Sequence, residues 1–116
     1  MSWRVLEFQR PRATSEEMVA WLGHLLATQG VRVSLAKEAV WGGIELTVEL
    51  AGRRTLLGVG EVQGRPGTYR AFTRPPSLLD QLLGRSRVRL RREVLDRLHR
   101  SLMNDSEARN VRWVEL

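Results

Sequence analysis

The chain has 116 residues, of which 42% are apolar and 28% are charged, a composition typical of one globular domain with a buried core. It contains no cysteine, which excludes disulfides, a thiolate nucleophile and a cysteine metal site, and which fits a reducing compartment. No apolar run approaches the roughly 20 residues that span a bilayer, and the charged N-terminal segment is not typical of a signal peptide. We therefore expect a single domain over residues 1–116, located in the cytoplasm and without membrane contact.

The net charge of +6 comes from the second half of the chain. Residues 1–61 contain seven basic and seven acidic side chains, whereas residues 62–116 contain twelve arginines and six acidic side chains. Within residues 65–92, eight arginines are offset only by Asp80. A macromolecular partner attracted by charge is therefore expected to meet this segment.

The first part of the sequence predicts a strand and a helix. Residues 3–9 are typical of a strand, which ends before a proline because proline has no ladder donor. Residues 15–28 then carry apolar side chains at helical spacing. Thr14 and Glu17 form the pattern of a capping box at the start of this helix, and Gly30 suits the left-handed residue that follows its end.

The middle of the sequence predicts three successive strands. Residues 31–35 alternate between apolar and polar side chains, and residues 36–43 are either a turn or a continuation of that strand. Residues 43–62 predict a β-hairpin, in which Gly52 supplies the positive φ that a tight two-residue turn requires. This loop length fixes the register and sets three pairs opposite each other: Glu49 and Arg54, Leu46 and Leu57, and Ile44 and Val59.

The last third of the sequence predicts a strand over residues 68–74, a helix over residues 90–103 and a final strand over residues 111–116. After two prolines, residues 77–84 suit a short helical turn closed by a glycine. Residues 85–89 alternate arginine with serine and valine, which indicates either an exposed loop or the beginning of the helix.

This order of elements predicts an α+β fold, with a mostly antiparallel sheet of five to six strands and two main helices packed on one face. The opposite face of the sheet is then either solvated or a binding surface. Its expected residues are polar or glycine: Glu45, Thr47, Glu49, Arg54, Gly58 and Gly60.

No pattern in the sequence predicts an active site, a metal site or a cofactor. His24 and His99 each stand alone on a helix, whereas a metal site needs clustered ligands. In the predicted hairpin register Glu61 points away from Glu45, so the carboxylates do not group as a two-metal site requires. We therefore expect no catalytic residue, no metal ligand and no bound cofactor.

Three glycines, Gly58, Gly60 and Gly64, resemble a phosphate-binding loop at first sight. Their spacing does not match such a loop, and no helix follows that could hold a phosphate at its N-terminus. A bulge, or the close approach of another part of the chain, is the better explanation of these glycines.

The arginines are the most distinctive functional feature of the sequence. They could contact phosphates, face an acidic protein, or form only a solvated surface. Trp41, which stands beside two glycines, is the tryptophan most expected to be exposed. The candidate partner-binding residues are Arg65, Arg70, Arg74, Arg85, Arg87, Arg89, Arg91, Arg92 and Trp41.

The C-terminal third also carries a recognisable succession of features. A strand ending in Arg74 is followed by a leucine-rich turn closed by Gly84, a helix, the pair Asn104 and Asp105, and Val111-Arg112-Trp113. This succession resembles small bacterial immunity proteins, which are made beside polymorphic or secreted toxins and block them by binding. The resemblance implies a direct protein binder, and the basic charge of this chain implies that the partner surface is acidic.

Three hypotheses follow from the sequence. The first is a non-enzymatic cytoplasmic binding protein, specifically an immunity protein that neutralises a cognate toxin. The second is a basic protein that binds nucleic acid or the ribosome through the arginines between Arg65 and Arg92. The third is an enzyme whose site is built from residues that look structural. Salt-dependent retention of nucleic acid distinguishes the second hypothesis from the first.

Overall fold

The computed structural model describes residues 4–73 and 85–116. This part of the chain contains six strands and two helices, which confirms the predicted α+β class. In chain order the elements are β1 (Arg4–Gln9), α1 (Ser15–Ala27), β2 (Arg32–Glu38), β3 (Ile44–Leu50), β4 (Arg53–Glu61), β5 (Thr68–Phe72), α3 (Arg85–Met103) and β6 (Arg109–Glu115). Trp3 and the predicted helical turn over residues 77–84 lie outside the described residues.

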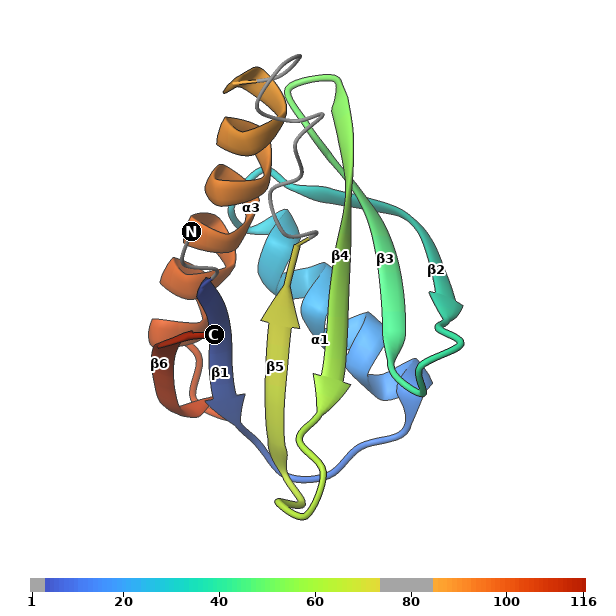
Figure 1. Cartoon of the computed structure of the whole chain (residues 1–116), viewed down its shortest axis with the longest axis vertical. Helices are drawn as coiled ribbons and strands as arrows, with labels where there is room; N and C mark the ends of the chain where they lie inside the picture. The colour runs from blue at the N-terminus through green and yellow to red at the C-terminus, as the bar shows by residue number, and fades with distance from the viewer. Residues whose placement is uncertain (1–3, 74–84) are drawn as a thin grey trace.

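The six strands form one antiparallel sheet in the order β2-β3-β4-β5-β1-β6 (Figure 1). Strands β2 to β5 follow one another in the sheet as they do in the chain. Strand β1 lies between β5 and β6, so the first and last strands of the chain are neighbours. One side of this open sheet, from β5 to β6, is therefore held together by pairings between residues far apart in the sequence.

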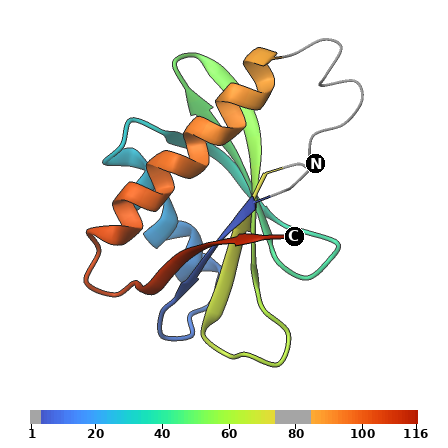
Figure 2. The same cartoon turned by 60° about the vertical axis from the view of Figure 1, so that its left-hand side comes forward.

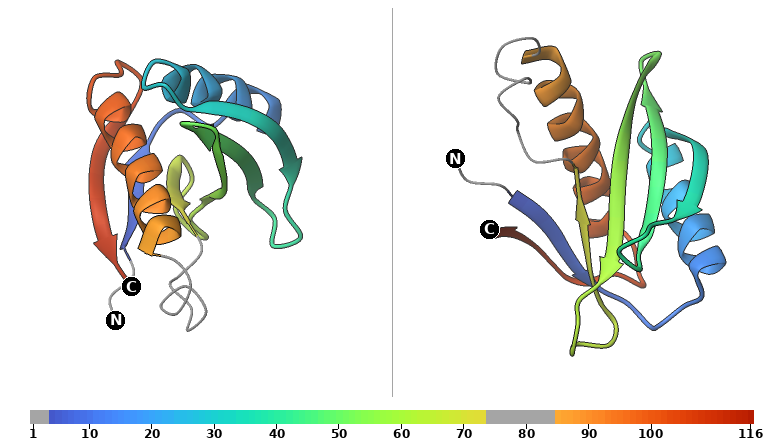
Figure 3. Two further views of the ribbon diagram at one scale, coloured as in Figure 1. Left: turned by 90° about the horizontal axis from the view of Figure 1, so that it is seen from above. Right: turned by 45° about the vertical axis from the view of Figure 1, so that its right-hand side comes forward.

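Both helices pack against the same face of the sheet, here called the inner face (Figures 2 and 3). The fully buried side chains between the helices and the inner face are mostly aliphatic, and they include Leu22, Leu26, Leu98, Phe8, Leu46 and Leu57. The two helices are also joined directly, because Ser101 Oγ donates a hydrogen bond of 2.9 Å to the Leu25 carbonyl. In the described part of the chain, no helix is both long enough and apolar enough to cross a membrane.

Helix α1 begins and ends as the sequence predicts. Thr14 Oγ1 accepts a hydrogen bond from the Glu17 backbone N–H, and the Glu17 carboxylate accepts one from the Thr14 backbone N–H, which is the complete capping box. Gly30 follows the helix with a φ of 77°, a left-handed conformation that glycine adopts without steric cost.

The β3–β4 hairpin also has the predicted register. Glu49 pairs with Arg54, Leu46 with Leu57 and Ile44 with Val59. Both turn residues have positive φ, 53° for Ala51 and 76° for Gly52, as a tight two-residue hairpin turn requires. The sequence indicated this conformation for the glycine only.

Strand β2 differs from the alternation seen in its sequence. The register with β3 shifts between Val33 and Leu35, which marks a β-bulge on this edge strand. The bulge turns Leu35 away from the core, so that its side chain is 59% exposed although Val33 packs against the core. Residues 36–43, which the sequence predicts as either a turn or a continuation of the strand, contain both: the end of β2 and then a turn.

Helix α3 begins five residues before the predicted start at Leu90. The arginine-rich stretch that was either a loop or the start of the helix is therefore helical from Arg85 onward. Arginine is a good helix former, and Leu90 is the first buried residue among those of α3 whose burial the structure describes. The apolar stripe thus marks where the helix meets the core, whereas the helix itself starts earlier.

Candidate functional site

The face of the sheet opposite the helices, here called the outer face, is turned toward the viewer in Figure 1. Side chains alternate between the faces, so Leu6 and Phe8 of β1 belong to the core whereas Val5 and Glu7 point to the outer face. No described helix or strand packs over this face. Within the described residues, another molecule could therefore meet the sheet at this face.

A buried carboxylate and three arginines occupy the β1 side of the outer face. Glu7 is only 2% exposed, and it lies directly opposite Arg70 of β5 and Arg112 of β6 in the two neighbouring strands. Arg112 Nε donates a hydrogen bond of 2.7 Å to Glu7 Oε2, and Arg70 Nε donates one of 3.1 Å to Oε1. Arg65, from the loop between β4 and β5, donates from Nη1 at 3.4 Å. These four residues are called the Glu7 cluster below.

The Glu7 carboxylate is held in its ionised form. Burial alone would raise its pKa, but the hydrogen bonds from Arg112 and Arg70 and the positive charges of Arg112 and Arg65 outweigh this effect. The pKa of Glu7 therefore lies below its ordinary value. The cluster combines three guanidinium groups with one carboxylate, which leaves it with a net charge of about +2 at neutral pH.

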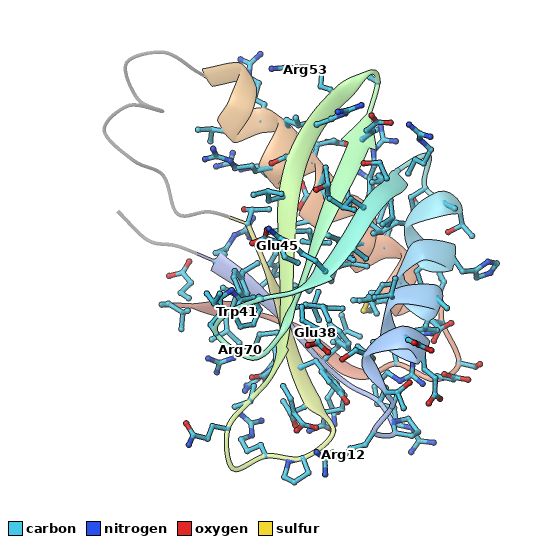
Figure 4. The ribbon with its side chains drawn as sticks, turned by 90° about the vertical axis from the view of Figure 1, so that its right-hand side faces the viewer. Arg12, Glu38, Trp41, Glu45, Arg53 and Arg70 are labelled. Carbon is cyan, nitrogen blue, oxygen red and sulfur yellow. The ribbon has the colours of Figure 1, made fainter. Side chains whose placement is uncertain are left out.

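An aromatic pair lies beside the Glu7 cluster. The Trp41 and Phe72 rings are 5.3 Å apart between centroids and are inclined by 50°. Trp41 is 48% exposed, as the sequence predicts, and it comes from the turn between β2 and β3. Figure 4 shows Trp41 next to Arg70, which pairs with Gly60 on β4.

Glycines make room for these two rings. A Cβ atom on Gly60 would lie 2.8 Å from Trp41 Cζ3, and one on Gly58 would lie 2.6 Å from Phe72 Cε2. Both contacts are too short for a side chain to be accommodated without movement of the ring. The interpretation as sites of close approach is thus confirmed for Gly58 and Gly60, whereas Gly64 has a φ of 78° and no atom within 4 Å of an added Cβ. The two rings belong to the outer face of the sheet itself.

The other half of the outer face is closer to balance in charge, since three basic side chains meet two carboxylates there. Glu49 of β3 accepts hydrogen bonds from Arg32 of β2 and from Arg54 of β4, the latter at 2.6 Å. The hydrogen bonds from Arg32 and Arg54 lower the pKa of Glu49. Lys37 and Glu45 form a further ion pair of 3.4 Å between β2 and β3. The larger excess of positive charge on this face, about +2 against about +1, therefore lies at the Glu7 cluster.

The structure divides the predicted arginines between two parts of the molecule. Arg65 and Arg70 lie on the outer face with Trp41, whereas Arg89 and Arg92 are exposed on α3, which packs against the inner face. Arg91, also on α3, is partly buried. Arg74 and the side chains of Arg85 and Arg87 lie outside the described part of the chain.

Sequence reasoning did not identify Glu7, Arg112 or Phe72 as residues of this surface. Glu7 carries a signal that could have been used, because it is the one charged residue in the segment from Val5 to Phe8, which is otherwise apolar. A charged residue in such a strand needs a partner when it is buried. The identity of the partners depends on the β1–β5 and β1–β6 pairings, which no local pattern in the sequence reveals.

The described residues present no grouping that could hold a metal ion through three histidine, aspartate or glutamate side chains. In the observed register Glu61 lies opposite Tyr69, and it points away from the outer face on which Glu45 lies, as predicted. Glu61 instead forms an ion pair of 3.2 Å with Arg12.

Comparisons of this chain with protein-family models, with curated proteins and with solved structures found no match.

Proposed function

We propose that this chain is a non-enzymatic binding protein that uses its outer sheet face to contact a protein partner with an acidic surface. The observation that carries the proposal is the Trp41–Phe72 pair, of which Trp41 is exposed, beside the Glu7 cluster on a face that no described element covers. Tryptophan and arginine are the residues most enriched at the energetic centres of protein interfaces. An aromatic pair next to excess positive charge suits a partner with both apolar and acidic side chains.

The titratable groups of the outer face suit a structural or binding role better than catalysis. A carboxyl group is most effective in general acid–base catalysis near neutral pH when its pKa is raised toward 7. The pKa values of Glu7 and Glu49 are instead lowered, because arginines donate hydrogen bonds to both carboxylates. Each carboxylate remains ionised and fixed by its partners at the pH at which a cell operates.

The distribution of charge on the outer face favours a protein over a nucleic acid as partner. A nucleic acid presents a regular series of phosphates, and its affinity comes mainly from their neutralisation. On the outer face Glu45 lies opposite Gly58, on which the Phe72 ring rests, so a carboxylate stands beside the aromatic pair where it would repel such a series. A protein surface with a few acidic groups can avoid this carboxylate.

An immunity function is the specific form of this proposal, in agreement with the resemblance noted above. It would be tested by expressing the protein encoded next to this chain in the native genome, alone and together with it. Arrested growth that this chain relieves, together with a purified complex of the two proteins, is the expected result. An adjacent protein that is harmless when expressed alone would overturn the immunity function.

The binding surface itself would be tested by calorimetry with the purified partner. We expect Trp41→Ala to weaken binding by about tenfold or more, equal to about 1.4 kcal/mol. Arg92→Gln, an exposed position on α3, is the matched control and should change the affinity by less than about threefold. Unchanged affinity in Trp41→Ala, or a partner that is released by nuclease treatment, would contradict the proposed protein interface.

A further inference from the structure

We infer that the three arginines of the Glu7 cluster form a preformed carboxylate-binding site, which takes an acidic side chain of the partner next to an apolar one. In this arrangement Glu7 is the internal anion that positions the arginines, and the partner carboxylate binds to N–H groups that Glu7 does not use. The inference rests on the proposed function, because it names the chemistry by which the outer face would recognise a protein.

The geometry of the hydrogen bonds leaves donors for a second anion. A guanidinium group has five N–H donors, and among the described contacts each of the three arginines gives one to Glu7. Arg70 and Arg112 do so through Nε, so the Nη1 and Nη2 groups at the end of each side chain are not engaged by Glu7. This end of the guanidinium group is the edge that binds a carboxylate in a bidentate manner.

The arginine side chains of the cluster are more exposed to solvent than Glu7, which suits the binding of a ligand from outside. The Arg112 side chain is 58% exposed and that of Arg65 is 45% exposed, although Glu7 between them is almost fully buried. Glu7 therefore lies at the base of the cluster, and the exposed parts of Arg112 and Arg65 lie above it. A carboxylate that approaches from solvent meets positive charge before it reaches Glu7.

Preorganisation makes the site more favourable than three free surface arginines. Arg70 and Arg112 stand on the two strands that flank β1, directly opposite Glu7 in both registers. Their side chains are held by hydrogen bonds before any ligand arrives, so less side-chain entropy is lost on binding. The net charge of about +2 in the cluster is partly removed when one carboxylate binds.

The neighbouring rings define the second part of the ligand. Arg70 pairs with Gly60, on which the Trp41 ring lies, so that the aromatic pair and the arginines share one region of the outer face (Figure 4). A partner segment that places an acidic side chain on Arg112 and Arg65 therefore brings its next residues over Trp41 and Phe72. Glutamate or aspartate close to leucine or an aromatic residue is the pattern we expect.

The test uses the full chain with nitrogen-15 labelled arginine and tryptophan, observed by NMR at the arginine Nε–H and indole N–H resonances. The first probe is a short capped peptide in which glutamate and leucine alternate, and its matched control has glutamine in place of glutamate. We expect the glutamate peptide to shift the resonances of Arg70, Arg112 and Trp41, with an affinity about tenfold or more above that of the control. Equal binding of the two peptides, or no shift up to about 5 mM peptide, would overturn the inference.

Two variants and a second probe make the assignment specific. Arg112→Gln leaves Glu7 with two arginine partners and should reduce affinity for the glutamate peptide by about fivefold or more, whereas Arg92→Gln on α3 should not reduce it. An oligothymidylate of about ten nucleotides that binds the same residues more tightly than the peptide would overturn the carboxylate assignment in favour of nucleic acid. If Trp41→Ala weakens the complex with the native partner and Arg112→Gln does not, the carboxylate site is wrong although the proposed protein interface stands.

Discussion

Glu7 and Arg112 are 105 residues apart in the sequence, and they lie directly opposite each other on β1 and β6, joined by a hydrogen bond of 2.7 Å. This contact connects the first strand of the chain with the last one. Arg70 makes the equivalent contact from β5, so three strands that are distant in sequence meet at one carboxylate. The same residues thus determine how the sheet is held together and where its positive charge is concentrated.

Replacing the buried carboxylate should destabilise the protein. Glu7→Gln keeps the size of the side chain but removes the charge that receives three charge-assisted hydrogen bonds. The glutamine oxygen can still accept hydrogen bonds from the arginines, so we expect the free energy of unfolding to fall by about 1.5–3 kcal/mol, the contribution of one hydrogen bond to a charged group. Urea denaturation followed by circular dichroism measures it. Glu49→Gln, whose arginine partners are largely exposed, is the control and should have the smaller effect.

The same carboxylate predicts a dependence of stability on pH. The pKa of Glu7 is lower in the folded protein than its ordinary value of 4.5, so the folded state binds fewer protons than the unfolded state below about pH 5. The stabilisation is therefore fully present above the unfolded pKa and is lost as the pH falls through the folded pKa. Denaturation midpoints between pH 7 and pH 3 should fall for the wild type and fall less for Glu7→Gln. Parallel pH profiles of the two proteins would show that Glu7 does not carry this dependence.

The core makes a separate prediction, because Leu98 of α3 is fully buried among the aliphatic side chains beneath the sheet. Leu98→Ala should cost about 2–5 kcal/mol, the range observed when a buried leucine leaves a cavity. Chemical denaturation provides the measurement, and Met103→Ala near the exposed end of the same helix is the comparison. A loss below about 0.5 kcal/mol at Leu98 would mean that α3 is not packed against the inner face as described.

A glycine substitution tests the aromatic part of the outer face without removing a ring. Gly60→Ala places a methyl group 2.8 Å from Trp41 Cζ3, which is too close, so the indole ring must move. We expect a changed indole N–H resonance for Trp41 and weaker partner binding, with the fold preserved. Gly23→Ala in α1 has no atom within 4 Å of the new methyl group and should raise the stability by up to about 1 kcal/mol. An unchanged Trp41 resonance in Gly60→Ala would mean that the ring does not rest on this glycine.

Local sequence patterns were sufficient to predict the parts of the fold that depend on residues close to each other in the sequence. The capping box of Thr14 and Glu17 and the register of the β3–β4 hairpin are fixed within a few residues, and both are confirmed. The bulge that exposes Leu35 was not predictable, because it depends on how β2 curves along β3. The sequence does not determine the start of α3 at Arg85, because the first turn of this helix has no apolar stripe.

The candidate site was predictable only in part, for a related reason. Arg65, Arg70 and Trp41 were expected to contact a partner, and the structure brings them to one face of the sheet. Their grouping with Glu7 and Arg112 follows from pairings between distant strands, which a sequence pattern does not encode locally. The charge totals of the chain located the excess of arginine, but they could not show that part of it lies on α3, against the inner face.

The two groups of arginines should therefore act on different steps of complex formation. Arg89 and Arg92 are exposed on α3, outside the proposed interface, so their charges can steer an acidic partner only through the long-range field. Replacing both with glutamate should slow association at low salt and leave the dissociation rate nearly unchanged. The effect should disappear at high salt, because the Debye length shrinks from about 10 Å at 0.1 M to about 3 Å at 1 M. Arg112→Gln should instead increase the dissociation rate, since it removes a contact within the complex. Surface plasmon resonance at both salt concentrations separates the two effects, and faster dissociation in the α3 variant would place the partner on the helix.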